Sequence, residues 1–332
     1  MKNLSFLAIL ATILLTGCQQ TEDLENTHEE LLVSIKASIE NTASSRYASD
    51  NENGTPNSLK FISGDKIGLF MEDSEVSIWT KNGNEWEHAP NIYWPNKSET
   101  KRNFYAFYPY PTNTETTTIS KSCVPMPSLN DQKGTIESLS TCDFMVATAQ
   151  QAYTDNNGTV LFEGNYSFKH INSLVAITIL KESDLENSTI NSISFEASNI
   201  ASTTTYSFTN TESPISINET EEPDFLQFND LNLSMANETS NKSLYFILNS
   251  GIDLSATTFC MNYTTGTKSY TATKTNLGSA TLKSGNRYNF NLNITDGVVS
   301  ITGGEIEEWG EGSDMDDIII NNPQEITSNE NP

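Results

Sequence analysis

The segment Asn156-Asn157-Gly158-Thr159-Val160-Leu161-Phe162 places a tight-turn signal directly before a short run of β-branched and apolar residues. Asn-Gly pairs favour the positive-φ turns that join two strands, and Val, Thr and Phe favour strands. Runs of the same kind recur from Leu59 onward and are separated by Gly, Asn, Asp or Pro. They include 67–71, 76–79, 103–108, 174–179, 244–248, 269–272 and 288–294. Because short strands punctuated by turn residues are typical of β-sandwiches, the sequence predicts an all-β fold.

The charge of the chain excludes a protein that coats DNA or RNA. Its 332 residues carry 18 basic and 43 acidic side chains, a net charge of -25, with a pI near 4.3. Neutralising phosphates needs clustered Lys and Arg, so we expect no nucleic-acid partner.

The sequence offers no catalytic or metal-binding set. Only His28, His88 and His170 supply imidazoles, and the Gly-Lys-Ser/Thr phosphate loop, the H-E-x-x-H motif and the G-x-S-x-G motif are missing. His170 stands at the start of a predicted strand, where a buried structural histidine is the better interpretation. We therefore expect no enzyme activity, no metal and no cofactor.

The first residues form a secretory signal. Lys2 precedes an apolar run over 4–15, which is too short to span a bilayer as a mature helix. The run ends in Leu15-Thr16-Gly17-Cys18, which resembles a bacterial lipoprotein signal. That resemblance implies acylation of Cys18, palmitate included, and anchoring in the outer membrane; Gln19 after the cysteine fits such sorting. The alternative is an ordinary signal peptide with an incidental cysteine.

An N-terminal strand is predicted just beyond the polar residues that follow Cys18. Leu31, Val33, Ile35, Ala37 and Ile39 repeat at every second position. This period is that of a half-buried strand. The next residues, 40–57, are polar and rich in turn formers.

Two sets of residues leave alternatives open. Cys123, Cys142 and Cys260 remain besides Cys18, and the first two could pair in an oxidising compartment or stay as buried thiols. Trp79, Trp86 and Trp94 could form a sugar-binding face or pack in the core.

A series of motifs resembles the fimbrillin family, the type V pilus subunits and fimbrillin-like lipoproteins of Gram-negative anaerobes. Besides the lipoprotein signal, the motifs are Gly64-Asp65-Lys66-Ile67-Gly68, Ile92-Tyr93-Trp94-Pro95, Phe104-Tyr105-Ala106-Phe107-Tyr108-Pro109, Asp143-Phe144-Met145-Val146-Ala147, Phe168-Lys169-His170-Ile171-Asn172-Ser173-Leu174, Gly285-Asn286-Arg287-Tyr288-Asn289-Phe290 and Ile306-Glu307-Glu308-Trp309. Each motif is weak alone, but their order over residues 18–312 is fairly specific.

The resemblance implies two tandem transthyretin-like β-sandwich domains and an assembly mechanism. In the family, an Arg-specific extracellular protease removes the N-terminal strand, and a strand of the next subunit fills the gap by β-augmentation. Arg46 lies just behind the predicted strand, so cleavage is expected between Arg46 and Tyr47; an ordinary surface arginine is the alternative. The expected donor is 298–309, unless that segment is the last hairpin of its own subunit.

These inferences divide the chain into five parts. They are a signal peptide at 1–17, a tether and N-terminal strand at 18–46, sandwich domains at 47–165 and 166–312, and an acidic polar tail at 313–332. The tail is predicted to lack structure apart from the apolar run 318–320, which this prediction does not explain.

The predicted function is a structural subunit of a bacterial fimbria at the outer membrane and cell surface, supporting cell adhesion. Its expected partners are other fimbrial subunits, the outer membrane through the lipid on Cys18, and a host or microbial surface ligand. The alternative is a monomeric surface lipoprotein that binds carbohydrate.

Overall fold

The computed structural model describes most of the chain after residue 30. The described residues are 31–40, 61–111, 118–139, 141–180, 185–217, 224–236, 241–295, 298–308, 312–313, 317–319 and 324–325. Cys18, Arg46 and Tyr47 lie outside them. Within these ranges, regular structure is almost entirely strand, and the only α-helix is the single turn α2 (Ile136–Leu139). The described part thus holds no helix of the length and apolarity that a membrane crossing requires. The prediction of an all-β fold is confirmed.

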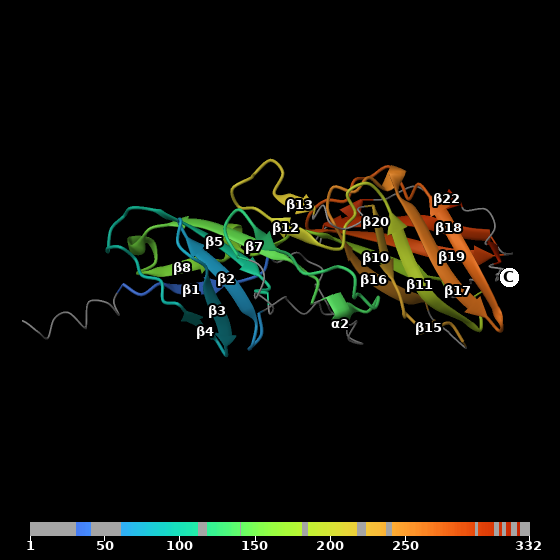
Figure 1. Ribbon diagram of the computed structural model, residues 1–332, viewed down its shortest axis with the longest axis horizontal. Coiled ribbons are helices and arrows are strands. Elements are labelled where there is room, and N and C mark those ends of the chain that lie inside the picture. Colours follow the sequence, from blue (N-terminus) through green and yellow to red (C-terminus); the bar gives the residue numbers. More distant parts are fainter. Residues whose placement is uncertain are drawn as a thin grey trace, which may run out of the picture.

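An antiparallel sheet of six strands, in the order β4-β3-β2-β5-β7-β9, forms the described N-terminal half (Figure 1). The strands are β2 (Lys66–Met71), β3 (Ser77–Asn82), β4 (Glu85–Ala89), β5 (Arg102–Tyr108), β7 (Met145–Gln151) and β9 (Lys169–His170). Successive side chains of a strand point to opposite faces. Along β2, Ile67 and Leu69 therefore enter one cluster of buried residues and Phe70 enters another.

The Ile67 face is covered by a small parallel sheet. Its strands are β1 (Ser34–Ala37) and β8 (Thr159–Phe162). The 3₁₀ turns η1 (Tyr153–Asp155) and η2 (Gly164–Tyr166) lie on either side of β8 in the sequence. Trp79, Phe104 and Phe162 are buried between the two layers.

The opposite face, around Phe70, is joined to the C-terminal half. The cluster here includes Phe107 and Phe144 and is completed by residues of a three-stranded sheet, β13-β12-β6. Its strands are β6 (Val124–Pro125), β12 (Thr204–Tyr206) and β13 (Ile215–Ile217). Because β6 precedes β7 in the chain and β12 follows β10, this sheet connects the two halves.

Two further sheets face each other in the C-terminal half. One has the order β16-β10-β19-β20-β21 with β22 also on β20, and the other has the order β14-β11-β17-β18-β23 with β15 also on β11. The strands are β10 (Ser173–Ile179), β11 (Ser188–Glu196), β14 (Phe225–Phe228), β15 (Leu233–Ser234), β16 (Lys242–Leu248), β17 (Thr258–Thr265), β18 (Lys268–Thr275), β19 (Asn286–Thr295), β20 (Val298–Glu308), β21 (Gly312–Ser313), β22 (Asp317–Ile319) and β23 (Gln324–Glu325), and the 3₁₀ turn η3 (Leu254–Ala256) precedes β17.

Aromatic rings fill the centre of this sandwich. Phe228 and Phe246 stack with ring centroids 4.4 Å apart, and Phe195 meets both edge-on. Edge-to-face and offset contacts of this kind add about 0.5–1.5 kcal/mol to the burial of each pair.

The division into tandem transthyretin-like domains at 165/166 stays a prediction. Leu129, Leu139 and Cys142 come before that boundary, yet they belong to the same buried cluster as the C-terminal sandwich. The side chain of Gln132 also contacts the C-terminal sandwich, because its Nε2 donates to the carbonyl of Ile247 at 2.9 Å.

The described parts of the C-terminal tail pair with sheet edges. Strand β22 runs antiparallel to β20, with Ile318 opposite Ile301, and β23 pairs with β18. From the sequence the tail is predicted to lack structure apart from 318–320, whereas β23 at Gln324–Glu325 is also paired.

Candidate functional site

The N-terminal strand β1 is held on one side by the segment that follows β4. The amide of Val33 donates to the carbonyl of Ile92 at 2.9 Å, and the amide of Trp94 donates to the carbonyl of Leu31 at 2.8 Å. This antiparallel pairing extends through a bridge between Leu32 and Tyr93.

On its other side β1 pairs with β8 in parallel. The amide of Ser34 donates to the carbonyl of Gly158 at 3.3 Å, and the amide of Ser38 donates to the carbonyl of Phe162 at 2.9 Å. We call the space that β1 fills between 92–94 and β8 the β1 slot. A strand bonded along both sides leaves few of its polar backbone groups unpaired.

The predicted alternation places apolar side chains of β1 and its flanks inside the slot. Val33, Ile35 and Ile39 are 0%, 7% and 1% exposed, whereas Ser34 and Lys36 between them face outward. Burying a side chain of this size stabilises a fold by about 1.5–3 kcal/mol. The predicted half-buried strand is therefore confirmed, and it covers an apolar slot.

The walls of the slot are fixed by Trp94. Its indole Nε1 donates to the carbonyl of Gly158 at 2.8 Å, and its ring meets Phe104 edge-on at 5.2 Å. Gly158 has a φ of +83°, a conformation that glycine adopts without strain, and its position against Tyr153 leaves no room for a Cβ. Sequence reasoning identified the Trp94 motif and the Asn157-Gly158 turn but did not place either beside β1.

The described interactions between β1, its flanks and the rest of the chain are hydrogen bonds, buried side chains and an ion pair. After Glu40, whose carboxylate lies 3.3 Å from the ammonium group of Lys169, residues 41–60 are outside the described part. This interval contains Arg46 and Tyr47. After a cut between them, the described contacts that hold β1 are the hydrogen bonds and buried side chains of the slot and the ion pair between Glu40 and Lys169.

Other candidate residues have structural roles. Nδ1 of His170 lies 2.9 Å from Oδ1 of Asp143, and both side chains are buried, as expected for a structural histidine. Trp79 and Trp94 are 1% and 2% exposed, so the interpretation as core residues is confirmed for both. Trp86 is half-buried, with the Lys81 ammonium group 5.2 Å from its ring centre.

The cysteines of the described part are free thiols. Cys123 and Cys260 are half-buried and Cys142 is buried, with no bond between Cys123 and Cys142. Burial is the largest cause that raises the pKa of the Cys142 thiol. Among the described residues, three or more His, Cys, Asp or Glu side chains nowhere gather as metal ligands.

The segment expected to donate a strand lies in its own sheet. Strand β20 pairs with β19 along most of its length, and Ile301 is 2% exposed. This arrangement agrees with the last-hairpin alternative.

Comparison with known proteins identifies the family. A model of the fimbrillin-like family matches residues 45–309. A candidate cell-adhesion protein from Bacteroides ovatus is similar at 15% identity with a TM-score of 0.57, over 85% of this chain and 98% of that one. Another, from Bacteroides uniformis, has 14% identity and a TM-score of 0.53, over 84% and 98%. At such identities these two structures show the fold alone. The comparison with curated proteins gives no match. Because the family model spans most of its length, this chain belongs to the fimbrillin-like family.

Proposed function

We propose that the chain is a structural subunit of a bacterial type V fimbria that supports cell adhesion. In this proposal it is exported as an outer-membrane lipoprotein through acylation of Cys18. An Arg-specific protease then cuts between Arg46 and Tyr47, and subunits join by exchange of a strand. Membership of the fimbrillin-like family, which is not an enzyme family, supports the fimbrial role.

The observation that carries the proposal is the burial of β1 in its slot. Removing 18–46 would expose the apolar surface that Val33, Ile35 and Ile39 cover and would free the backbone groups of 92–94 and β8. Unpaired strand edges readily accept a strand of another chain, whose main-chain hydrogen bonds supply affinity. A sister subunit then regains the stability that the lost strand supplied.

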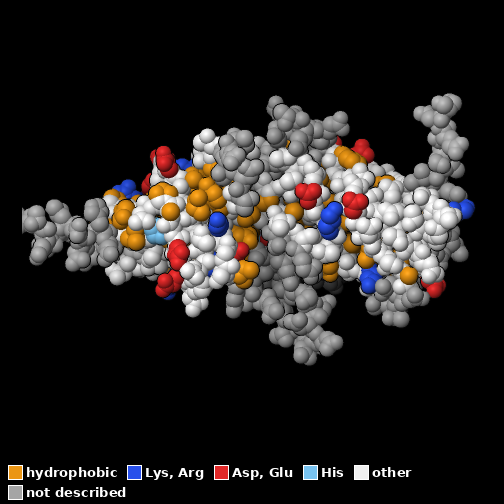
Figure 2. Space-filling model, turned by 60° about the horizontal axis from the view of Figure 1, so that its bottom comes forward, with side chains coloured by type: hydrophobic (Ala, Val, Ile, Leu, Met, Phe, Trp, Pro, Cys, Tyr) orange, Lys and Arg blue, Asp and Glu red, His pale blue; other side chains and the backbone are white. Residues whose placement is uncertain are grey.

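The surface of the N-terminal half suits such a contact. Three of the exposed large hydrophobic residues of the described part, Ile62, Tyr93 and Tyr166, lie in this half. Tyr93 is bridged to the strand segment itself, and Tyr166 belongs to the turn that follows β8. On the face drawn in Figure 2, hydrophobic side chains gather over the same half.

The test is to sequence the N-terminus of the mature surface form and to examine its polymers. We expect a start at Tyr47 and a ladder of polymers that survives mild denaturant. Arg46→Ala should keep the blocked, acylated Cys18 and give no ladder.

Arg287→Lys is the matched control, because Arg287 lies on β19 in the C-terminal sandwich and away from the slot. It should be processed and polymerise like the wild type. Normal polymers from Arg46→Ala would overturn the processing step.

The carbohydrate-binding alternative based on tryptophans has lost its main support. Trp79 and Trp94 are buried, so neither ring offers a face to a sugar.

A further inference from the structure

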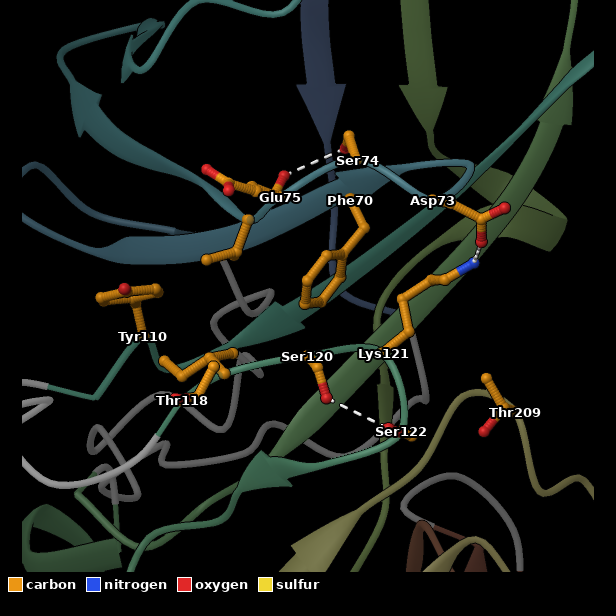
Figure 3. Close-up of a pocket in the computed structure, with 12 residues that line it drawn as sticks. Phe70, Asp73, Ser74, Glu75, Tyr110, Thr118, Ser120, Lys121, Ser122 and Thr209 are labelled. Carbon is orange, nitrogen blue, oxygen red and sulfur yellow. Dashed lines mark hydrogen bonds and ion pairs between the residues drawn. The ribbon is translucent and has the colours of Figure 1, made fainter.

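A cavity of about 570 Å³ opens where the two halves of the chain meet (Figure 3). It is lined by the turn between β2 and β3, by 118–122, and by Thr209 of the β12–β13 hairpin. The amide of Phe208 donates to the carbonyl of Lys121 at 2.7 Å, which fixes the hairpin against the second of these segments. Pockets that bind small molecules occur preferentially at such junctions.

One wall of the cavity is aromatic. Tyr110 lines it, and its ring stacks on buried Phe107 with centroids 6.0 Å apart and an interplanar angle of 26°. Phe70 forms the floor and is 1% exposed. Tyr110 is therefore a supported aromatic platform, and burial raises the pKa of its phenol further above neutral pH.

Hydroxyl groups line the cavity from all three segments, beside the apolar side chains of Val76 and Ile119. Thr118, Ser122 and Thr209 are exposed at its rim, with Ser120 beside them. The hydroxyl of Ser74 is already engaged, because it donates to the carbonyl of Glu75 and accepts from the amide of Met71. Ser120 and Ser122 hydroxyls lie 3.1 Å apart, within the tight turn that 120–123 forms. Neutral groups that can both donate and accept are well matched to a ligand with several hydroxyls.

Among the described lining residues, the one ammonium group is paired with a carboxylate. Nζ of Lys121 lies 2.6 Å from Oδ1 of Asp73 and 5.0 Å from the ring centre of Tyr105. The carboxylate of Glu75 remains, so these described residues carry a net charge of about -1 at neutral pH. This charge disfavours phosphate, sulfate or carboxylate ligands.

We propose that this cavity binds a neutral saccharide unit, with the apolar face of a pyranose ring on Tyr110. The ring hydroxyls are met by Ser and Thr hydroxyls and by the carboxylate of Glu75. This site is separate from the β1 slot and does not depend on strand exchange. It differs from a tryptophan face, since no tryptophan lines it.

The test uses the uncleaved chain from residue 18 onward with Cys18→Ser, so that it stays unacylated and keeps β1 in its slot. The probe is an array of neutral oligosaccharides of hexoses and N-acetylhexosamines, with sialylated and sulfated glycans beside them. We expect retention on neutral glycans, and calorimetric titration with the best free oligosaccharide then gives the affinity. Retention on no glycan, or only on charged glycans, overturns the proposal.

Variants locate the site. Tyr110→Ala should weaken binding at least about tenfold, whereas Tyr110→Phe should stay within about threefold because the platform remains. Thr209→Trp fills the cavity from an exposed position, so it should abolish binding without affecting folding. Phe225→Ala, at an exposed aromatic outside the cavity, is the matched control and should bind like the wild type. Unchanged affinity in both Tyr110→Ala and Thr209→Trp excludes this cavity.

Discussion

At the scale of the residue, the structure shows why the motif Gly64-Asp65-Lys66-Ile67-Gly68 ends in a glycine. Its φ is not in the left-handed region, but a Cβ at this position would overlap the ring of Phe107, which is fully buried. We predict that Gly68→Ala lowers the free energy of unfolding by about 1–3 kcal/mol, because the ring has to leave its packed position. Denaturant unfolding measures the loss.

A double-mutant cycle separates this overlap from an effect on the strand itself. Phe107→Ala is destabilising alone, but it removes the ring that Gly68 accommodates. The cost of Gly68→Ala should therefore shrink in that background. An equal cost in both backgrounds would show that the ring is not the reason.

His88 gives the chain a pH dependence that can be assigned to one group. Its ring stacks on Trp79 at 4.0 Å, and burial, opposed by a weaker backbone interaction with Pro90, lowers its pKa below 6.5. The unfolded chain then takes up a proton more readily than the folded chain, so stability falls as pH drops through 6.5.

His88→Phe keeps the stacked ring without the titration. Between about pH 7.5 and 5.5 the wild type should lose stability relative to this variant, as followed by thermal melting. A parallel pH profile would contradict the prediction.

At the scale of the element, strand β1 offers two neighbouring positions with opposite environments. Ile35 is buried in the slot and Lys36 is exposed. Ile35→Ala should lower stability by about 2–5 kcal/mol, and after proteolytic cleavage the N-terminal fragment should separate on gel filtration. Lys36→Ala should leave both the melting temperature and the retention of the fragment unchanged. Equal effects at the two positions would mean that the slot does not hold the strand.

Strand β1 also shows which features of the fold the sequence could predict and which it could not. Alternation predicts the inward positions of Val33, Ile35 and Ile39 because the period is local. The partner of β1 is not local: Ser34 faces Thr159 in a parallel register, and no turn signal links segments so far apart. Similarly, the alternation around Ile301 fits a strand of its own sheet as well as a donated strand, so sequence alone could not choose between them. The cavity at Tyr110 has no motif because three separate segments build it.

At the scale of the whole molecule, aromatic side chains of the β12–β13 hairpin contribute to the joint between the halves. Phe208 lies 5.5 Å from Tyr105 and 6.4 Å from Phe70 of the N-terminal sheet, measured between ring centres. Backbone hydrogen bonds cross the same joint: the amide of Phe208 donates to the carbonyl of Lys121 at 2.7 Å, and the amide of Met126 donates to the carbonyl of Thr204 at 3.0 Å. The strength of this joint decides whether the two cores unfold together.

We predict that Phe208→Ala uncouples the two cores. The wild type should unfold in one calorimetric transition, whereas the variant should show two, because the aromatic contacts that Phe208 makes with Tyr105 and Phe70 are worth about 0.5–1.5 kcal/mol each. Phe225→Ala is the matched control, since that phenylalanine is 48% exposed on β14, away from the joint. A single transition that merely moves to lower temperature in Phe208→Ala would show that the main-chain pairing of β6 with β12 is enough to couple the halves.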